Sequence, residues 1–196
     1  EVSGTIVFKG ESVGNSPKEA IAAGIALVPE ERRTQGLFTQ LTIRENIPVM
    51  NLQSMSNNGL YRLAQEQSIA HKYVEQLSIA TNSIEKHTEK LSGGNQQKVV
   101  VAKCLFSEPD LLLLDEPTRG VDVGAKTEIY DIIKNLADKG NSVAVFSSEL
   151  EEILGICDRV FLLYSGSLVS EFINGPDIDI NNILNLVTGG NQGVTQ

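Results

Sequence analysis

Two adjacent carboxylates stand directly after a short apolar run in the middle of the chain. The run covers residues 111–114, and Asp115 and Glu116 follow it. A buried strand that ends in such a pair carries both carboxylates to the carboxyl edge of a sheet, where α/β proteins bind ligands. Asp115 suits Mg²⁺, directly or through water, and Glu116 suits the polarisation of a water for in-line attack on a terminal phosphate.

A second candidate site lies upstream, in the segment LSGGNQQKVVVAKCL at 91–105. Its two glycines open a predicted helix whose first amides have no partner inside the helix and lie at the positive end of the helix dipole. Such an N-terminus binds phosphate. Ser92 adds a hydroxyl donor, and the missing Cβ atoms of Gly93 and Gly94 let a ligand approach the backbone.

The segment GVDVGAKT at 120–127 has the spacing of a phosphate loop, except that Ala125 stands where the second glycine belongs. However, the carboxylates of Asp115, Glu116 and Asp122 crowd the same stretch and would repel a triphosphate. We therefore interpret this segment as the loop after the carboxylate pair and the start of the next helix.

The composition is that of an ordinary globular domain. The chain has 196 residues, 41% of them hydrophobic, and a formal net charge of −9. The acidic balance argues against a nucleic-acid binder, whose surface should be basic. No apolar run approaches the length of a membrane span. The two cysteines, Cys104 and Cys157, are expected to be buried thiols.

Hydrophobic periodicity predicts alternating strands and helices. The expected strands cover 4–10, 25–28, 111–114, 142–146, 160–164 and 167–172, and the expected helices cover 16–24, 42–50, 60–79, 95–107, 124–138, 149–155 and 178–187. A polar loop, PEERRTQG, follows the strand at 25–28. Short buried strands separated by helices predict an α/β fold with a parallel sheet.

Three segments together resemble the ATPase of an ABC transporter. LSGGNQQK resembles the signature motif, LLLLDEPTRGVDVGAK the Walker B motif with its D-loop, and VAVFSSELEEI the switch region. More narrowly, EPTRGVDVGAK and SSELEEILGICDRV are similar to the second of two ATPase halves in the single-chain ATPases of bacterial ribose, galactose and xylose importers. The resemblance covers residues 4–172.

The resemblance implies a P-loop NTPase (RecA-like) fold with a helical subdomain. It places the core at 1–36 and 91–172, the helical subdomain at 37–90, and a C-terminal helix and tail at 173–196. In that family the phosphate loop (Walker A) precedes the segment GTIVFKG, so the resemblance implies an N-terminally truncated domain. The strand that feeds this loop is central, so we expect a gap, a dimer contact or a swapped strand beside LLLL and VAVF.

The resemblance also assigns site residues. Such ATPase halves pair head to tail, and each nucleotide lies between the phosphate loop of one half and the signature of the other. Ser92, Gly93, Gly94 and Asn95 would then bind the ATP of the partner half. Asn95 replaces the more usual Gln and keeps the amide donor with one methylene less.

The remaining residues would belong to this half's own site. Asp115 would hold Mg²⁺, Glu116 would be catalytic, and Asp122 would lie in the D-loop beside the nucleotide. Two positions depart from the family pattern: Glu30 stands where Gln is usual in the loop that senses the membrane subunit, and Ser148 stands where the switch His is usual. The loss of a positioned His implies that this half hydrolyses ATP poorly.

The function implied is the energy-coupling, ATP-binding subunit of an ABC sugar importer, with ATP and Mg²⁺ as cofactors. Its partners would be the other ATPase half, membrane-spanning permease subunits and, indirectly, a sugar-binding protein. It would lie on the cytoplasmic face of the bacterial cell membrane, and the fragment alone would be inactive. Two alternatives remain open: a non-catalytic docking module, and an ABC ATPase that acts on nucleic acid or ribosomes.

Overall fold

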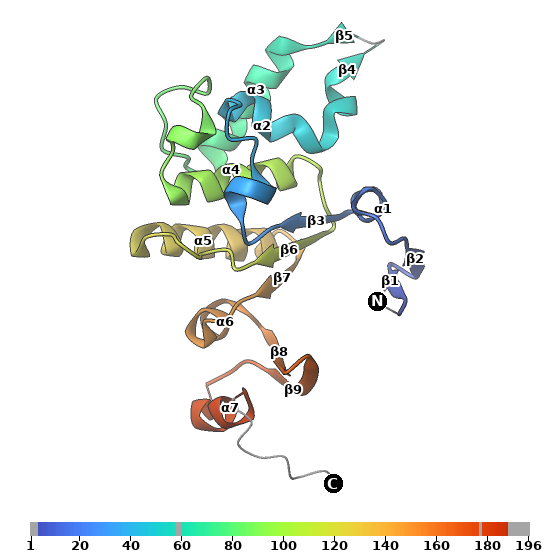
Figure 1. Cartoon of the computed structure of the whole chain (residues 1–196), viewed down its shortest axis with the longest axis vertical. Helices are drawn as coiled ribbons and strands as arrows, with labels where there is room; N and C mark the ends of the chain where they lie inside the picture. The colour runs from blue at the N-terminus through green and yellow to red at the C-terminus, as the bar shows by residue number, and fades with distance from the viewer. Residues whose placement is uncertain (1–3, 58–59, 177, 188–196) are drawn as a thin grey trace. The chain divides into compact units, whose positions relative to one another are not determined.

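The computed structural model describes residues 4–57, 60–176 and 178–187 (Figure 1). The chain forms two compact units, Glu1–Phe146 and Ser147–Gln196, and each is described by itself. Across the described ranges, no helix combines the length and apolarity that a membrane crossing requires.

A three-stranded parallel sheet lies at the centre of the first unit. Its strands stand in the order β3, β6, β7, with the bounds Ile25–Val28, Leu111–Asp115 and Ser142–Phe146. The middle strand is the most deeply buried, and its Leu112 and Leu114 are each 1% exposed. All three strands and their parallel pairing confirm the prediction from sequence.

Two long helices cover this sheet. α4 (Gly93–Leu105) packs against β3, and α5 (Val123–Asp138) packs against β7. Nearly every residue of α4 is buried, so it forms the core of the unit. The Cys104 thiol donates to the carbonyl of Leu27 in β3 at 3.4 Å, and burial raises its pKa to about 11. Both helices were predicted, to within two residues at their N-termini.

β7 is an edge strand of this sheet. In the ranges that the structure describes, β7 pairs with β6 on one side and with no strand on the other. The Phe146 side chain at its end is 54% exposed. The open edge agrees with the gap that was expected beside VAVF, but no gap lies beside LLLL, because β6 pairs with a strand on each side.

The segment between β3 and α4 is mainly helical. It contains α2 (Ile43–Asn46), the 3₁₀ stretch η2 (Ile47–Met55), the short strands β4 (Ser56–Asn57) and β5 (Leu60–Tyr61), α3 (Leu63–Gln76) and the 3₁₀ turn η3 (Thr88–Lys90). Figure 1 shows α2 and α3 in one cluster of helices beside α4, and α2 contacts both α3 and α4.

The single helix predicted over 42–50 is wrong in its second half. Thr42 begins α2 with a capping box to Glu45. Pro48 has no N–H to continue the α-helical pattern, and Asn51 has φ of −141°, so the chain changes to 3₁₀ geometry. The helix predicted from residue 60 starts at Leu63 because the residues before it pair as strands.

One arginine joins three parts of this helical segment. Arg44 on α2 donates to Glu85 through Nε (2.7 Å) and Nη2 (3.1 Å), and its Nη1 pairs with Glu66 on α3. The Glu66 carboxylate is buried, with 3% of its side chain exposed. Because a buried carboxylate needs such a partner, Arg44 fixes α3 on α2.

The loop predicted after β3 contains a helical turn. Residues Arg32–Gly36 form the single π-turn η1. Such turns are rare and frequently occur at functional sites. The polar sequence gave no periodicity that could reveal it.

The N-terminal strand predicted over 4–10 is a hairpin. β1 (Ile6–Phe8) pairs antiparallel with β2 (Glu11–Val13). The turn between them is Lys9 and Gly10, both at positive φ, as a two-residue hairpin turn requires. α1 (Pro17–Ala22) follows with Ser16 as its N-cap and confirms the predicted short helix.

The second unit contains α6 (Leu150–Ile156), the antiparallel hairpin of β8 (Arg159–Tyr164) and β9 (Ser167–Ile173), and α7 (Ile180–Val187). Its core is Val160, Leu162 and Ile183. The two predicted strands are confirmed in position, but they pair with each other and not in a parallel sheet. The tail expected after the C-terminal helix falls on residues 188–196, which lie outside the described residues.

Candidate functional site

Two loops and one helix N-terminus meet at the carboxyl edge of the parallel sheet. Val28, the last residue of β3, pairs with Leu114 of β6, so the loops that follow the two strands start side by side. The first loop contains Glu30 and η1, and the second contains Asp115, Glu116 and the residues up to α5. The start of α4 lies against both, as the contacts of Gly93 show.

Glu116 holds an unusual backbone conformation at the predicted catalytic position. Its φ is +44°, in the left-handed region, which costs a residue other than glycine about 1 kcal/mol. Two hydrogen bonds keep it there: its N–H donates to the Phe146 carbonyl (2.8 Å), and its carbonyl accepts from the Arg119 N–H (3.1 Å). The strain therefore sits where the sequence predicted the water-polarising group.

Asp115 is the single residue that the sequence assigned to a metal. Among the described residues, no three of the His, Cys, Asp and Glu side chains gather into a metal site. One half-buried carboxylate at the end of β6 fits Mg²⁺, because this ion keeps several waters and takes further oxygens from substrate phosphates. Asp115 would then hold the ion, and the ion would neutralise charge on those phosphates.

Glu30, expected to place a negative charge near the phosphates, has a partner of its own. Its Oε1 forms an ion pair with Nη1 of Arg119, across the two loops. The Arg119 side chain is 61% exposed, so the pair is screened by solvent and orients the loops more than it stabilises the fold. Arg119 was not predicted from the sequence as this partner.

Arg32 joins the same two loops through the backbone. Its Nη1 donates to the carbonyl of Arg119 (2.8 Å), and its Nη2 donates to the carbonyl of Gly120 (3.1 Å). Burial lowers the pKa of Arg32, and the like charge of Arg33 lowers it further. No residue pattern indicates this role of Arg32, because its acceptors are main-chain carbonyls.

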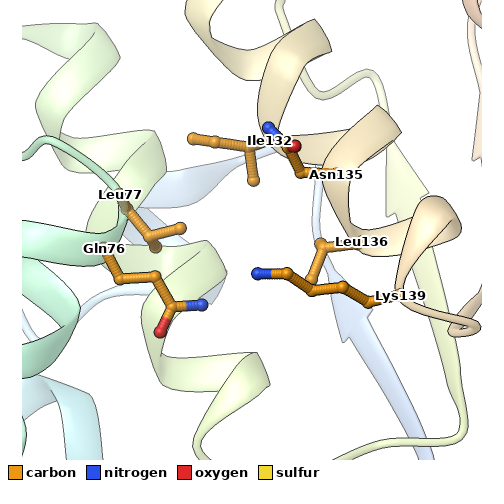
Figure 2. A pocket seen from close by; sticks show the side chains of 6 residues that line it. All are labelled: Gln76, Leu77, Ile132, Asn135, Leu136 and Lys139. Carbon is orange, nitrogen blue, oxygen red and sulfur yellow. The ribbon is translucent and has the colours of Figure 1, made fainter.

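A cleft of about 260 Å³ opens where these groups meet, lined by Glu30, Glu31, Arg32, Arg33, Arg119 and Gly120. A second cavity of about 220 Å³ lies between α3 and α5 and is lined by Gln76, Leu77, Ile132, Asn135, Leu136 and Lys139 (Figure 2). None of the residues that the sequence assigned to a site lines the second cavity, so the carboxyl edge of the sheet remains the candidate site.

The two signature glycines also have a packing role within the protein. A Cβ on Gly93 would lie 2.8 Å from Nη2 of Arg32 and 3.1 Å from the Gly120 carbonyl, and a Cβ on Gly94 would lie 2.5 Å from the Cβ of Ala125. The positions that these Cβ atoms would take are therefore already occupied by Arg32, Gly120 and Ala125. Gly94 allows α4 to approach α5, and Gly93 allows α4 to approach Arg32.

Ser92 and Asn95 are joined to each other and to the end of the helical segment. Asn95 Nδ2 donates to Ser92 Oγ (2.9 Å), and Asn95 Oδ1 accepts from the Ala80 N–H (2.7 Å). Ser92 is exposed and forms no side-chain cap with its own helix. Because a lone pair of its oxygen already accepts from Asn95, its hydroxyl hydrogen is directed elsewhere.

Asp122 serves as the N-cap of α5, and its Oδ1 accepts from the Ala125 N–H at 3.0 Å. A carboxylate thus occupies the helix start where a phosphate loop would hold its phosphate. This placement supports our interpretation of 120–127. Ser148, the remaining predicted residue, is exposed and precedes α6 in the second unit.

Comparison with protein families matches residues 1–119 to the family described as ABC transporter. The chain is 44% identical over 189 residues to the ribose import ATP-binding protein RbsA of Bacillus licheniformis, covering 96% of this chain and 38% of that protein. It is 46% identical over 172 residues to the L-arabinose transport ATP-binding protein AraG of Geobacillus stearothermophilus, covering 87% of this chain and 34% of that protein.

A third relative is the xylose import ATP-binding protein XylG of Thermoanaerobacter pseudethanolicus, 43% identical with 95% of this chain and 37% of that protein covered. Among solved structures, an ATP-binding cassette in a dimeric post-hydrolysis state bound to ADP and Pi superposes with a TM-score of 0.74. It is 20% identical, with 89% of this chain and 75% of that chain covered.

The parallel sheet with its carboxylate pair and signature helix defines an α/β protein with the P-loop NTPase fold of ABC ATPases. The chain belongs to the ABC transporter family. It spans somewhat more than a third of the length of the curated relatives named above, which are sugar import or transport ATP-binding proteins.

The contact between Gly94 and Ala125 predicts the effect of a single methyl group. Gly94→Ala should lower the free energy of unfolding of the chain by about 1–3 kcal/mol, because the new Cβ overpacks the α4–α5 contact. Ala125→Gly in the same chain should restore part of the loss. Urea unfolding followed by circular dichroism measures both.

Gly124→Ala is the matched control, since its Cβ would meet only Asp122 Oδ1 at 3.5 Å, an ordinary contact. Equal unfolding free energies for the Gly94→Ala and Gly124→Ala chains would contradict the packing role of Gly94.

Proposed function

We propose that the chain is part of the energy-coupling, ATP-binding subunit of an ABC importer for a sugar. The observation that carries the proposal is the start of α4, where Ser92 is exposed and precedes helix amides that have no partner within the helix. Three curated relatives are named for the import of ribose or xylose or the transport of L-arabinose, which supports a sugar as the transported substrate.

The proposed role of the signature is to bind the γ-phosphate of ATP held by a partner ATPase half. The first amides of α4 are orphan donors at the positive end of the helix dipole, and they attract phosphate. The hydrogen bond from Asn95 leaves the hydroxyl hydrogen of Ser92 free to point at the ligand. Gly93 and Gly94 contribute backbone amides, and their missing side chains make room for Arg32 and Ala125.

This half's own site is proposed to be catalytically weak. Asp115 would hold Mg²⁺ against the phosphates, and Glu116 would polarise the attacking water. Arg119 partly neutralises the charge that Glu30 brings to the site. Ser148 cannot supply the proton transfer or charge stabilisation of a histidine, which contributes two or more powers of ten in rate. Asp122 would border the nucleotide while capping α5.

The assembly follows from the same proposal. The partners would be a second ATPase half, paired head to tail, membrane-spanning permease subunits and, through them, a sugar-binding protein, at the cytoplasmic face of the bacterial membrane. We also propose the division into a core (1–36 and 91–172), a helical subdomain (37–90) and a C-terminal part (173–196). The net charge of −9 disfavours a nucleic-acid partner.

We expect the 196-residue chain by itself to bind ATP no better than millimolar. Its sequence contains no G-x-x-x-x-G-K-[ST] segment, so four or more charge-assisted bonds to phosphate are missing, about 6–12 kcal/mol in total. Isothermal titration calorimetry with Mg²⁺-ATP tests this expectation. A dissociation constant in the micromolar range would refute it.

In the two-half ATPase, Ser92→Ala should lower kcat/KM for ATP about 10- to 100-fold, the effect of one hydrogen bond to a charged group. Asn95→Ala should lower kcat/KM less, because Asn95 acts only by orienting the Ser92 hydroxyl. Asn95→Asp retains the shape but accepts the serine hydrogen, so it should act like Ser92→Ala or worse. Steady-state ATP hydrolysis measures all three.

A double-mutant cycle separates the two roles that Asn95 could have. If Asn95 acts by orienting Ser92, then Asn95→Ala has no further effect in the Ser92→Ala background. If the reductions in kcat/KM of the two single variants instead multiply in the double variant, Asn95 contacts the nucleotide independently, as expected from the sequence. The orienting role is then wrong.

A further inference from the structure

The strongest unassigned feature of the site is the guanidinium of Arg32. It lies where the loop after β3, the loop after Glu116 and the first turn of α4 come together. Nη1 and Nη2 donate to two successive carbonyls, those of Arg119 and Gly120, 87 and 88 residues along the chain. Nη2 also lies 2.8 Å from the position that a Cβ of Gly93 would take.

The geometry fits arginine and not lysine. Two parallel N–H donors on one planar group match two neighbouring carbonyl oxygens, whereas an ammonium on a flexible stem holds one of them at a time. The Nε of Arg32 is buried and has no hydrogen-bond partner among the described residues. An unpaired buried donor is costly, so the Nε of Arg32 does not stabilise the fold. The two hydrogen bonds of Nη1 and Nη2 therefore account for an arginine at this position.

Arg32 acts on the exposed tip of a loop that the ion pair of Arg119 with Glu30 also contacts. The internal hydrogen bonds of this loop run from Arg119 N–H to the Glu116 carbonyl (3.1 Å) and from Val121 N–H to the Thr118 carbonyl (3.2 Å). Gly120 at its tip has φ of +65°, and both Arg119 and Gly120 are exposed. The two guanidinium donors of Arg32 therefore act on an exposed part of the stretch that begins at Glu116.

We propose that Arg32 is a positioning residue. It holds the loop formed by residues 116–122 against the start of α4, so that the two move as one rigid body. The positioning role stands on the contacts alone, whereas its effect on nucleotide sites rests on the proposed function. Glu116 serves this half's own site, and Ser92 to Gly94 serve the nucleotide of the partner half. A displacement of one element is transmitted through Arg32 to the other, so the two sites are mechanically coupled within this half.

The first arm of the test uses the 196-residue chain and needs no nucleotide. Hydrogen exchange followed by NMR reports on the amides of Arg119 and Val121. Arg32→Met should speed their exchange at least about tenfold, because the turn loses the fork that holds it closed. Arg32→Lys should give an intermediate increase. Amides in β6 should be unchanged, which excludes global unfolding.

Arg33→Met is the matched control, since Arg33 lies in the same π-turn and donates to Gln96 Oε1 at 3.2 Å instead of to the loop. In the Arg33→Met variant, the amides of Arg119 and Val121 should exchange hydrogen at the same rate as in the unmodified chain. Unchanged exchange in Arg32→Met, or an equal increase in Arg33→Met, would overturn the positioning role.

The second arm uses the two-half ATPase. Arg32→Lys should lower kcat at least about fivefold with KM for ATP within twofold, because the residue orders the loops and does not touch the nucleotide. A change in KM alone, or no change in either constant, would overturn the coupling even if the exchange result holds. If the unmodified ATPase hydrolyses no ATP, the proposed function fails while the first arm still decides the role of Arg32.

Discussion

The parallel pairing of β3, β6 and β7 is the constraint on which the candidate site depends. Each of Leu112 and Leu114 is 1% exposed, and burial of such side chains contributes about 1.5–3 kcal/mol each. Because the strands run in one direction, the loops that follow them emerge at one edge. This places Arg32 beside Arg119, although the two are 87 residues apart in the chain.

Contacts within the protein, more than open space, shape the site. The glycines of the signature accommodate Arg32 and Ala125, and Asn95 directs its donor at Ser92. At this carboxylate-rich edge, Arg119 pairs with Glu30, and Arg32 donates to the carbonyls of Arg119 and Gly120. Ser92 at the start of α4 is exposed, and a hydroxyl beside the first amides of a helix suits phosphate.

The sequence predicted the parts of the fold that depend on apolar runs and on helix signals. β3, β6 and β7 are short apolar segments, and the glycines and Asp122 mark where α4 and α5 begin. It could not predict the π-turn at Arg32–Gly36 or the fork of Arg32, because rare backbone geometry and main-chain acceptors leave no residue pattern. The ion pair of Glu30 with Arg119 depends on strand order, which appears only in three dimensions.

The central claim is that the signature of this chain binds a nucleotide held by another ATPase half. Hydrogen exchange at the amides of Gly93, Gly94 and Asn95 tests it directly, with Mg²⁺-ATP and a hydrolysis-blocked two-half ATPase. The account predicts that ATP slows exchange at these amides when both halves are present and leaves it unchanged in the 196-residue chain alone. Equal protection by ATP in the isolated chain, or no protection in the paired halves, would contradict it.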